Sequence, residues 1–111
     1  MIRSQIIIDF YKANSAILAK SQMLEDALTK ALMEHGVKLD MSKFYQFEPE
    51  GVSATIVSPE LQLSVHTWPE HGSCTIDMFS QLGHEFTTTI AEEVKNFLEA
   101  QEYDIKVLNR K

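Results

Sequence analysis

The sequence has few of the residues that disulfides and metal sites require. Its 111 residues include a single cysteine, Cys74, so an internal disulfide is excluded, and no Cys-x-x-Cys pair of the zinc-binding kind is present. The spacing of the four histidines matches no familiar metal motif, since they lie at positions 35, 66, 71 and 84. We therefore predict that the chain binds no metal ion.

Long apolar runs are also missing. No stretch approaches the roughly 18 apolar residues that a membrane span needs. The opening stretch, MIRSQIIIDFYKANS, differs from a signal peptide because its run of isoleucines is short and leads directly into Asp9. We expect a cytoplasmic protein that makes no contact with a membrane.

Positive charge is scarce as well. Ten Lys and Arg residues stand against 16 Asp and Glu residues, which gives a formal charge of −6, and Lys and Arg cluster only in the C-terminal NRK. A nucleic-acid partner would require a basic surface to neutralise phosphates, so we expect none, whereas a cationic small molecule is compatible with this charge. The length and the hydrophobic fraction of 44% fit one globular domain, residues 1–111.

The apolar residues follow patterns that predict six strands and two helices. Alternation and β-branched residues indicate strands at residues 4–11, 37–49, 51–58, 61–68, 73–81 and 103–110. Helical spacing indicates a first helix with Ser21 as N-cap and a stop at Gly36, and a second over residues 87–100, where Thr89 and Glu92 have capping-box spacing. This order predicts an α+β, two-layer sandwich, in which a mostly antiparallel sheet carries both helices on one face. The other face is left to solvent or to a partner.

The run GVSATIVSPELQLSVHTWPEHGSCTIDMF, residues 51–79, resembles the core of the bacterial and archaeal S-adenosylmethionine decarboxylases. The motif VHTWPE at residues 65–70, Gly72, and IDMF at residues 76–79 match the family pattern closely. The first strand, both helices and the last strand also fit that family. The resemblance covers nearly the whole chain and implies the family's fold and a place among the proteins of polyamine and spermidine biosynthesis.

Members of that family make a pyruvoyl cofactor from a serine of their own chain. The serine hydroxyl attacks the preceding carbonyl, the resulting ester eliminates, and the new pyruvoyl carbonyl forms a Schiff base with the substrate amine. By resemblance, the junction lies five residues before the histidine of the HTWPE motif, which is Glu60-Leu61 here. Leucine has neither a nucleophilic oxygen nor a β leaving group, so we expect no pyruvoyl group and no other cofactor.

Two further family side chains are replaced. The histidine after the serine is Gln62, and the cysteine that donates a proton to the decarboxylated carbon is Gln81, which is not an acid. Cys74 cannot take over this role in a regular strand, because positions 74 and 81 differ in parity and face opposite sides. We expect Cys74 to be a small residue of the core.

Other family positions keep their side chains. Ser53 and His66 resemble the pair that assists self-cleavage and then lines the site. Phe47 resembles the aromatic residue that stacks on adenine, Trp68 a wall of the same pocket, and Glu70 the carboxylate that holds the ribose hydroxyls. Each of these residues also has a purely structural explanation. Ser53 and His66 can be a hydrogen-bonded pair on neighbouring strands, and Glu70 can be a solvated turn residue. Phe47 and Trp68 can be aromatic residues of the core or of an interface.

These residues leave several functions open. The first is a family homologue that does not process itself, is not an active lyase, and regulates by binding S-adenosylmethionine, a related nucleoside or a polyamine, as a homodimer or with an active paralogue. The second is an active decarboxylase cleaved at another hydroxyl, for which Ser53, Ser58 and Ser64 are available. The third is a pyruvoyl-free activity with His66 as acid and base. The fourth is a pure interaction module.

Overall fold

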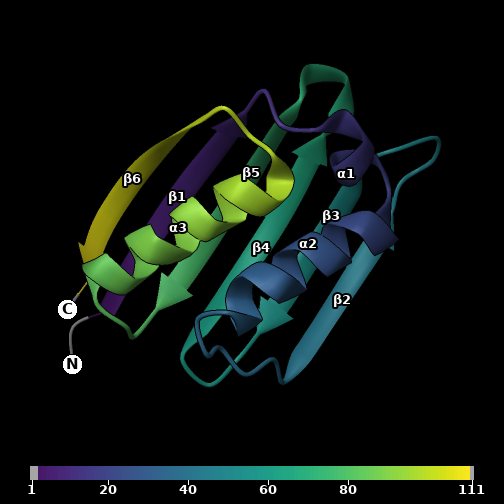
Figure 1. Ribbon diagram of the computed structural model, residues 1–111. Helices are drawn as coiled ribbons and strands as arrows, with labels where there is room; N and C mark the ends of the chain where they lie inside the picture. The colour runs from purple at the N-terminus through teal and green to yellow at the C-terminus, as the bar shows by residue number, and fades with distance from the viewer. Residues whose placement is uncertain (1–2, 111) are drawn as a thin grey trace.

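The computed structural model describes residues 3–110, except for the side chains of residues 3, 4, 84, 109 and 110. His84 and the basic C-terminus named above therefore fall outside the described side chains. Along the chain (Figure 1) the elements are β1 (Arg3–Tyr11), α1 (Ser15–Ala19), α2 (Ser21–Met33), β2 (Met41–Gln46), β3 (Val52–Val57), β4 (Leu61–Trp68), the 3-10 turn η1 (Pro69–His71), β5 (Ser73–Ser80), α3 (His84–Leu98) and β6 (Glu102–Arg110). No helix within residues 3–110 is long and apolar enough to cross a membrane.

The six strands form one antiparallel sheet in the order β2-β3-β4-β5-β1-β6. Strands β2 to β5 follow one another as hairpins, and β1 is inserted between β5 and the last strand, β6. The helices all cover the same face of the sheet (Figure 1). The predicted α+β fold, with an antiparallel sheet and helices on one face, is confirmed, although there are three helices rather than two.

The core lies between the helices and the covered face of the sheet. Along β4 the side chains alternate, so that Leu61, Leu63 and Val65 are buried while Gln62 and His66 are exposed on the other face. The helices complete the core with their apolar stripes. The largest fully buried side chains include Ile6, Ile8, Phe10, Leu24, Leu28, Leu32, Ile76 and Ile90. The uncovered face, called the open face below, carries the other half of every strand.

The helix starts differ from the predicted ones. Helix α2 begins after Lys20, which makes no side-chain cap, and the N–H of Ser21 instead donates to Gln46 Oε1 at 2.7 Å. Helix α3 begins at His84, so Thr89 lies inside it and donates to the Glu85 carbonyl at 2.9 Å. The predicted N-cap and capping box are therefore wrong, because spacing alone does not distinguish a helix start from an exposed helix interior.

Candidate functional site

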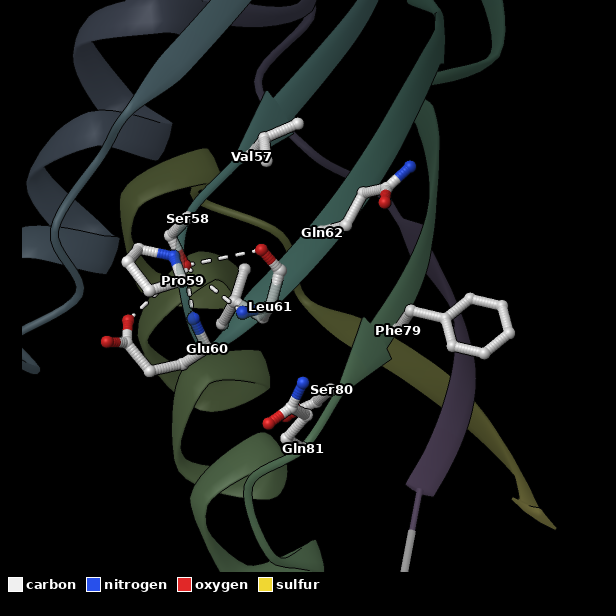
Figure 2. Close-up of a pocket in the computed structure, with 9 residues that line it drawn as sticks. All are labelled: Val57, Ser58, Pro59, Glu60, Leu61, Gln62, Phe79, Ser80 and Gln81. Atoms are coloured by element: carbon white, nitrogen blue, oxygen red, sulfur yellow. Dashed lines mark hydrogen bonds between the residues drawn. The ribbon is translucent and has the colours of Figure 1, made fainter. Parts of the chain in front are cut away.

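The position at which family members cleave their chain is a closed β-hairpin turn here. The N–H of Ser58 donates to the Leu61 carbonyl at 2.9 Å, which leaves Pro59 and Glu60 as a two-residue connection between β3 and β4. Ser58 Oγ accepts from the N–H groups of Leu61 and Glu60 at 3.1 and 3.3 Å (Figure 2). Leu61 is only 3% exposed and pairs with Ser80 of β5. The N–H and the hydroxyl of Ser58 are therefore both bonded within the turn, and Leu61 lies in the core.

A donor already faces the carbonyl that precedes Leu61. The N–H of Gln81, the residue at the family's proton-donor position, donates to the Glu60 carbonyl at 3.1 Å. A backbone N–H in this place stabilises negative charge that develops on a carbonyl oxygen under attack. The Glu60 carbonyl is therefore polarised by a hydrogen bond, but residue 61 has no oxygen that could attack it. Beside it lies a cavity of about 190 Å³, lined by residues 57–62 and 79–81 (Figure 2).

Ser53 and His66 lie on the open face of neighbouring strands. They are directly opposite in the β3–β4 register, and Ser53 Oγ is 3.1 Å from His66 Nδ1. The His66 ring also lies beside Trp68, with ring centroids 6.4 Å apart, and Trp68 is 43% exposed. Ser53 and His66 therefore form a hydrogen-bonded pair with an aromatic neighbour and access to solvent, and their role in a site stays a prediction.

Within one chain, this pair lies far from the hairpin turn. Leu61 and His66 are five residues apart on β4, which is about 17 Å in an extended strand, and their side chains face opposite sides of the sheet. His66 therefore cannot assist chemistry at Leu61 of the same chain. The sequence analysis assigned the Ser53–His66 pair and the cleavage position at Leu61 to one site. The family pattern gives the order of these residues along the chain, but it does not give the distance between them within one folded chain.

The three predicted ligand residues lie towards the same end of the sheet, but they line no common cavity among those described. Phe47 follows β2, is 48% exposed and packs edge-on against Tyr45 with centroids 4.8 Å apart. Its neighbour Gly51 adopts a φ of 109°, and a Cβ there would lie 3.8 Å from the Pro69 ring, so the Phe47 loop approaches η1 closely. Glu70 is exposed in η1. Trp68 instead lines a cavity with side chains of β1 and β5.

Cys74 belongs to the core, as predicted. It is fully buried on the covered face of β5. Burial raises the pKa of its thiol to about 12, and the charge of Asp9 adds to the rise. A neutral, buried thiol on the face opposite to Ser53 and His66 is not an acid for that site. No group of three or more His, Cys, Asp or Glu side chains among the described residues could hold a metal ion.

Two polar residues that the sequence analysis did not name as site residues, Thr75 and Asp9, lie next to the Ser53–His66 pair on the open face. Thr75 lies opposite His66 on β5, and its hydroxyl donates to Asp9 Oδ1 of β1 at 2.6 Å. Asp9 in turn lies opposite Asp104 of β6. The alternation of β1 indicates that Asp9 faces the open side, but nothing local to the sequence places β1 beside β5.

The fold and the hairpin define an α+β protein built on the plan of the adenosylmethionine decarboxylases. The structure superposes on the adenosylmethionine decarboxylase of Aquifex aeolicus with a TM-score of 0.85 and 22% identity, over 96% of this chain and 88% of the other. The Trypanosoma brucei AdoMetDC-delta26 monomer superposes with a TM-score of 0.68 and 14% identity, over 94% of this chain and 45% of that one.

The sequence identifies the family directly. Residues 4–111 match the family model described as S-adenosylmethionine decarboxylase, and the chain belongs to this family. Similar curated proteins include the S-adenosylmethionine decarboxylase proenzymes of Thermosipho melanesiensis and Thermotoga petrophila, which are 40% and 36% identical over 75 residues. The matched segment covers 68% of this chain but only 58% of the length of these relatives.

Proposed function

We propose that this protein is a member of the S-adenosylmethionine decarboxylase family that neither processes itself nor decarboxylates, and that it acts in the cytoplasm as a ligand-binding regulator. The observation that carries this proposal is Leu61 at the cleavage position. Its side chain is hydrocarbon, it is buried, and it closes a hydrogen-bonded hairpin. Without a hydroxyl or thiol there, no ester forms and no pyruvoyl group follows.

The alternative, cleavage at another serine, finds little support in the surroundings of these hydroxyls. Ser58 Oγ is occupied within the hairpin turn, accepting two backbone N–H groups, and the side chain is 7% exposed. Ser53 is hydrogen-bonded to His66, and Ser64 lies in the middle of β4. Attack by any of them on its preceding carbonyl would first require regular strand or turn structure to open.

The purified protein is therefore expected to be one uncleaved chain of 12.7 kDa. Intact mass spectrometry under denaturing conditions checks this directly. Because each serine would produce a different pair of fragments, the same spectrum identifies any alternative junction. A pyruvoyl-blocked fragment that begins at residue 53, 58 or 64 would contradict the proposal and establish the active-enzyme reading.

The ligand that we propose is an S-adenosylmethionine-like nucleoside, held at the end of the sheet where Phe47, Trp68 and Glu70 gather. An exposed aromatic ring offers a stacking surface worth about 1–3 kcal/mol for a base. A carboxylate can accept both hydroxyls of a ribose diol, and a charge-assisted hydrogen bond contributes about 1.5–3 kcal/mol. After the entropic cost of association, we expect a Kd between micromolar and millimolar.

Replacing Glu70 by glutamine tests this ligand. Calorimetry is expected to show S-adenosylmethionine or methylthioadenosine binding about tenfold more weakly to Glu70→Gln, since the diol loses a charged acceptor. A ligand without a diol should bind the variant and the parent alike. Glu25→Gln on helix α2, on the covered side of the sheet, is the matched control. If neither S-adenosylmethionine nor methylthioadenosine binds the parent protein at millimolar concentration, the ligand proposal is wrong and the protein is better explained as a pure interaction module.

We further propose that the open face joins two copies of the chain or joins the chain to a paralogue. The family resemblance implies dimers with the site near the interface. Ser53 and His66 lie on the open face, about 17 Å along β4 from Leu61 of the same chain. Two copies that pack through this face could bring one chain's pair towards the other chain's hairpin.

A further inference from the structure

The two halves of the proposed nucleoside site belong to separate parts of the chain. Phe47 begins the loop of residues 47–51 that follows β2, whereas Trp68 ends β4 and Glu70 lies in η1. The distance between the halves therefore depends on what connects them. A short segment that contains α1, residues 13–21, lies at this end of the molecule (Figure 1) and is called the strap below.

The first part of the strap is bound to the turn after β4. Ser15 Oγ donates to the Pro69 carbonyl at 2.9 Å, and the Thr67 hydroxyl donates to the Leu18 carbonyl at 2.8 Å. Pro69 and Thr67 are the two chain neighbours of Trp68. Helix α1 is thus attached to the backbone on both sides of that tryptophan.

The second part of the strap is bound to the Phe47 loop. The Gly51 N–H donates to the Ala19 carbonyl at 3.0 Å, and Lys20 Nζ donates to the Pro49 carbonyl at 3.2 Å. The loop itself is closed by the Phe47 N–H, which donates to the Gly51 carbonyl at 2.8 Å. The strap is therefore hydrogen-bonded to both halves of the nucleoside site.

Gln46, which directly precedes the loop, joins the loop to the strap at one point. Its Oε1 accepts from the Ser21 N–H at 2.7 Å. Its Nε2 lies near three carbonyl oxygens, at 2.8 Å from Ala19, 3.0 Å from Phe47 and 3.1 Å from Gly51. A carboxamide donates and accepts at the same time, which neither a carboxylate nor a thioether of similar length can do. Removal of this group would leave several backbone groups without a partner.

We propose that Gln46 is a positioning residue, which fixes the Phe47 ring relative to Trp68 and Glu70 by holding the Phe47 loop on the strap. This inference rests on the nucleoside site proposed above, because it names what keeps the two halves of that site at one separation. The position of the loop is also a property of the free protein. Since a loop opens locally at lower cost than the whole domain unfolds, loss of Gln46 should loosen the loop first.

Amide hydrogen exchange, followed by NMR, tests the position of the loop without a ligand. In Gln46→Met, the N–H groups of Phe47 and Gly51 are expected to exchange about tenfold faster relative to the slowest amides of β4. Gln22→Met is the matched control, because it removes an exposed carboxamide of α2 that bonds only to Asp26 among the described side chains. Equal exchange at the loop in the two variants would overturn the proposal.

A second variant separates the loop from the start of α2. Gln46→Glu keeps the length of the side chain and an acceptor for the Ser21 N–H, and a negative charge is favourable at a helix N-terminus. At neutral pH the carboxylate has no hydrogen to donate to the loop. The Phe47 and Gly51 amides should therefore again exchange faster, while those of α2 stay as in the parent. Unchanged exchange at the loop would contradict the role of the Gln46 donor.

Calorimetry with methylthioadenosine tests the consequence for the nucleoside site. Gln46→Met is expected to raise the Kd about fivefold to tenfold when Phe47 is present, and less than about twofold in a Phe47→Leu background, where the loop carries no stacking ring. A merely structural role would weaken binding equally in both backgrounds, and that result would overturn the proposal. If the parent binds no nucleoside at millimolar concentration, the proposed ligand is wrong, and the exchange measurement decides by itself whether Gln46 holds the loop.

Discussion

Replacing Leu61 by serine together with Gln62 by histidine is expected to make the chain cleave itself into residues 1–60 and 61–111. The serine would place a hydroxyl next to the Glu60 carbonyl, whose oxygen already accepts the Gln81 N–H at 3.1 Å. Self-cleavage then requires only proton transfer and elimination. An error of about 1 Å in the position of reacting groups can cost roughly a hundredfold in rate, so we expect cleavage over hours to days.

Intact mass spectrometry during incubation follows the reaction. Leu61→Ala with Gln62→His removes the same buried leucine without supplying a nucleophile, and it should remain whole. If the double variant with serine also stays whole after days, the hairpin has diverged in more than these two side chains. Adding Gln81→Cys afterwards tests whether slow decarboxylation returns with the proton donor.

The same variant tests assembly. Because His66 lies about 17 Å along β4 from residue 61 and on the other face, any help from His66 must come from a second copy. Adding His66→Ala to the double variant is expected to slow cleavage, and mixing with an excess of the parent chain, which retains His66, is expected to restore it. If the double variant cleaves at the same rate with and without His66→Ala, the Ser53–His66 pair takes no part in self-cleavage.

Replacing Thr67 by valine is expected to lower the free energy of unfolding by roughly 2–4 kcal/mol, since two buried backbone groups lose their partner. Thr67 Oγ1 accepts from the Val52 N–H at 2.9 Å and donates to the Leu18 carbonyl at 2.8 Å, and the residue is only 8% exposed. This hydroxyl connects β3, β4 and α1 at the point where the HTWPE motif begins to turn. Valine keeps the shape and removes only the hydrogen bonds.

Urea unfolding monitored by circular dichroism gives the loss directly. Thr67→Ser retains the hydroxyl and removes one methyl group, so it should cost only about 1 kcal/mol. If valine proves no more destabilising than serine, the two hydrogen bonds do not contribute to stability as their burial indicates. A selective loss of nucleoside binding in the valine variant, at temperatures where it stays folded, would show that this connection also positions Trp68 and Glu70.

The sequence by itself determined the faces of the strands and the two longer helices, because these features depend on the spacing of neighbouring residues along the chain. Alternation assigns each strand residue to a face, and it correctly placed Cys74 in the core. The apolar stripes predicted α2 and α3. The absence of a hydroxyl at position 61 is evident from the sequence, because the residue there is leucine. Helix α1 escaped prediction because its five residues are too few to show a period, and its N-cap Asn14 and the Thr67–Leu18 bond hold it in place.

Only the tertiary structure decided which of these side chains are neighbours. A strand period states which face a residue occupies but not which strand lies beside it, since pairing and register depend on contacts between distant parts of the chain. Strand β1 pairs with β5 and β6, so Asp9 meets Thr75 and Asp104 across more than sixty residues of sequence. By the same pairing, Ser53 meets His66 while Leu61, much closer to His66 in sequence, lies at the far end of β4 and on its other face.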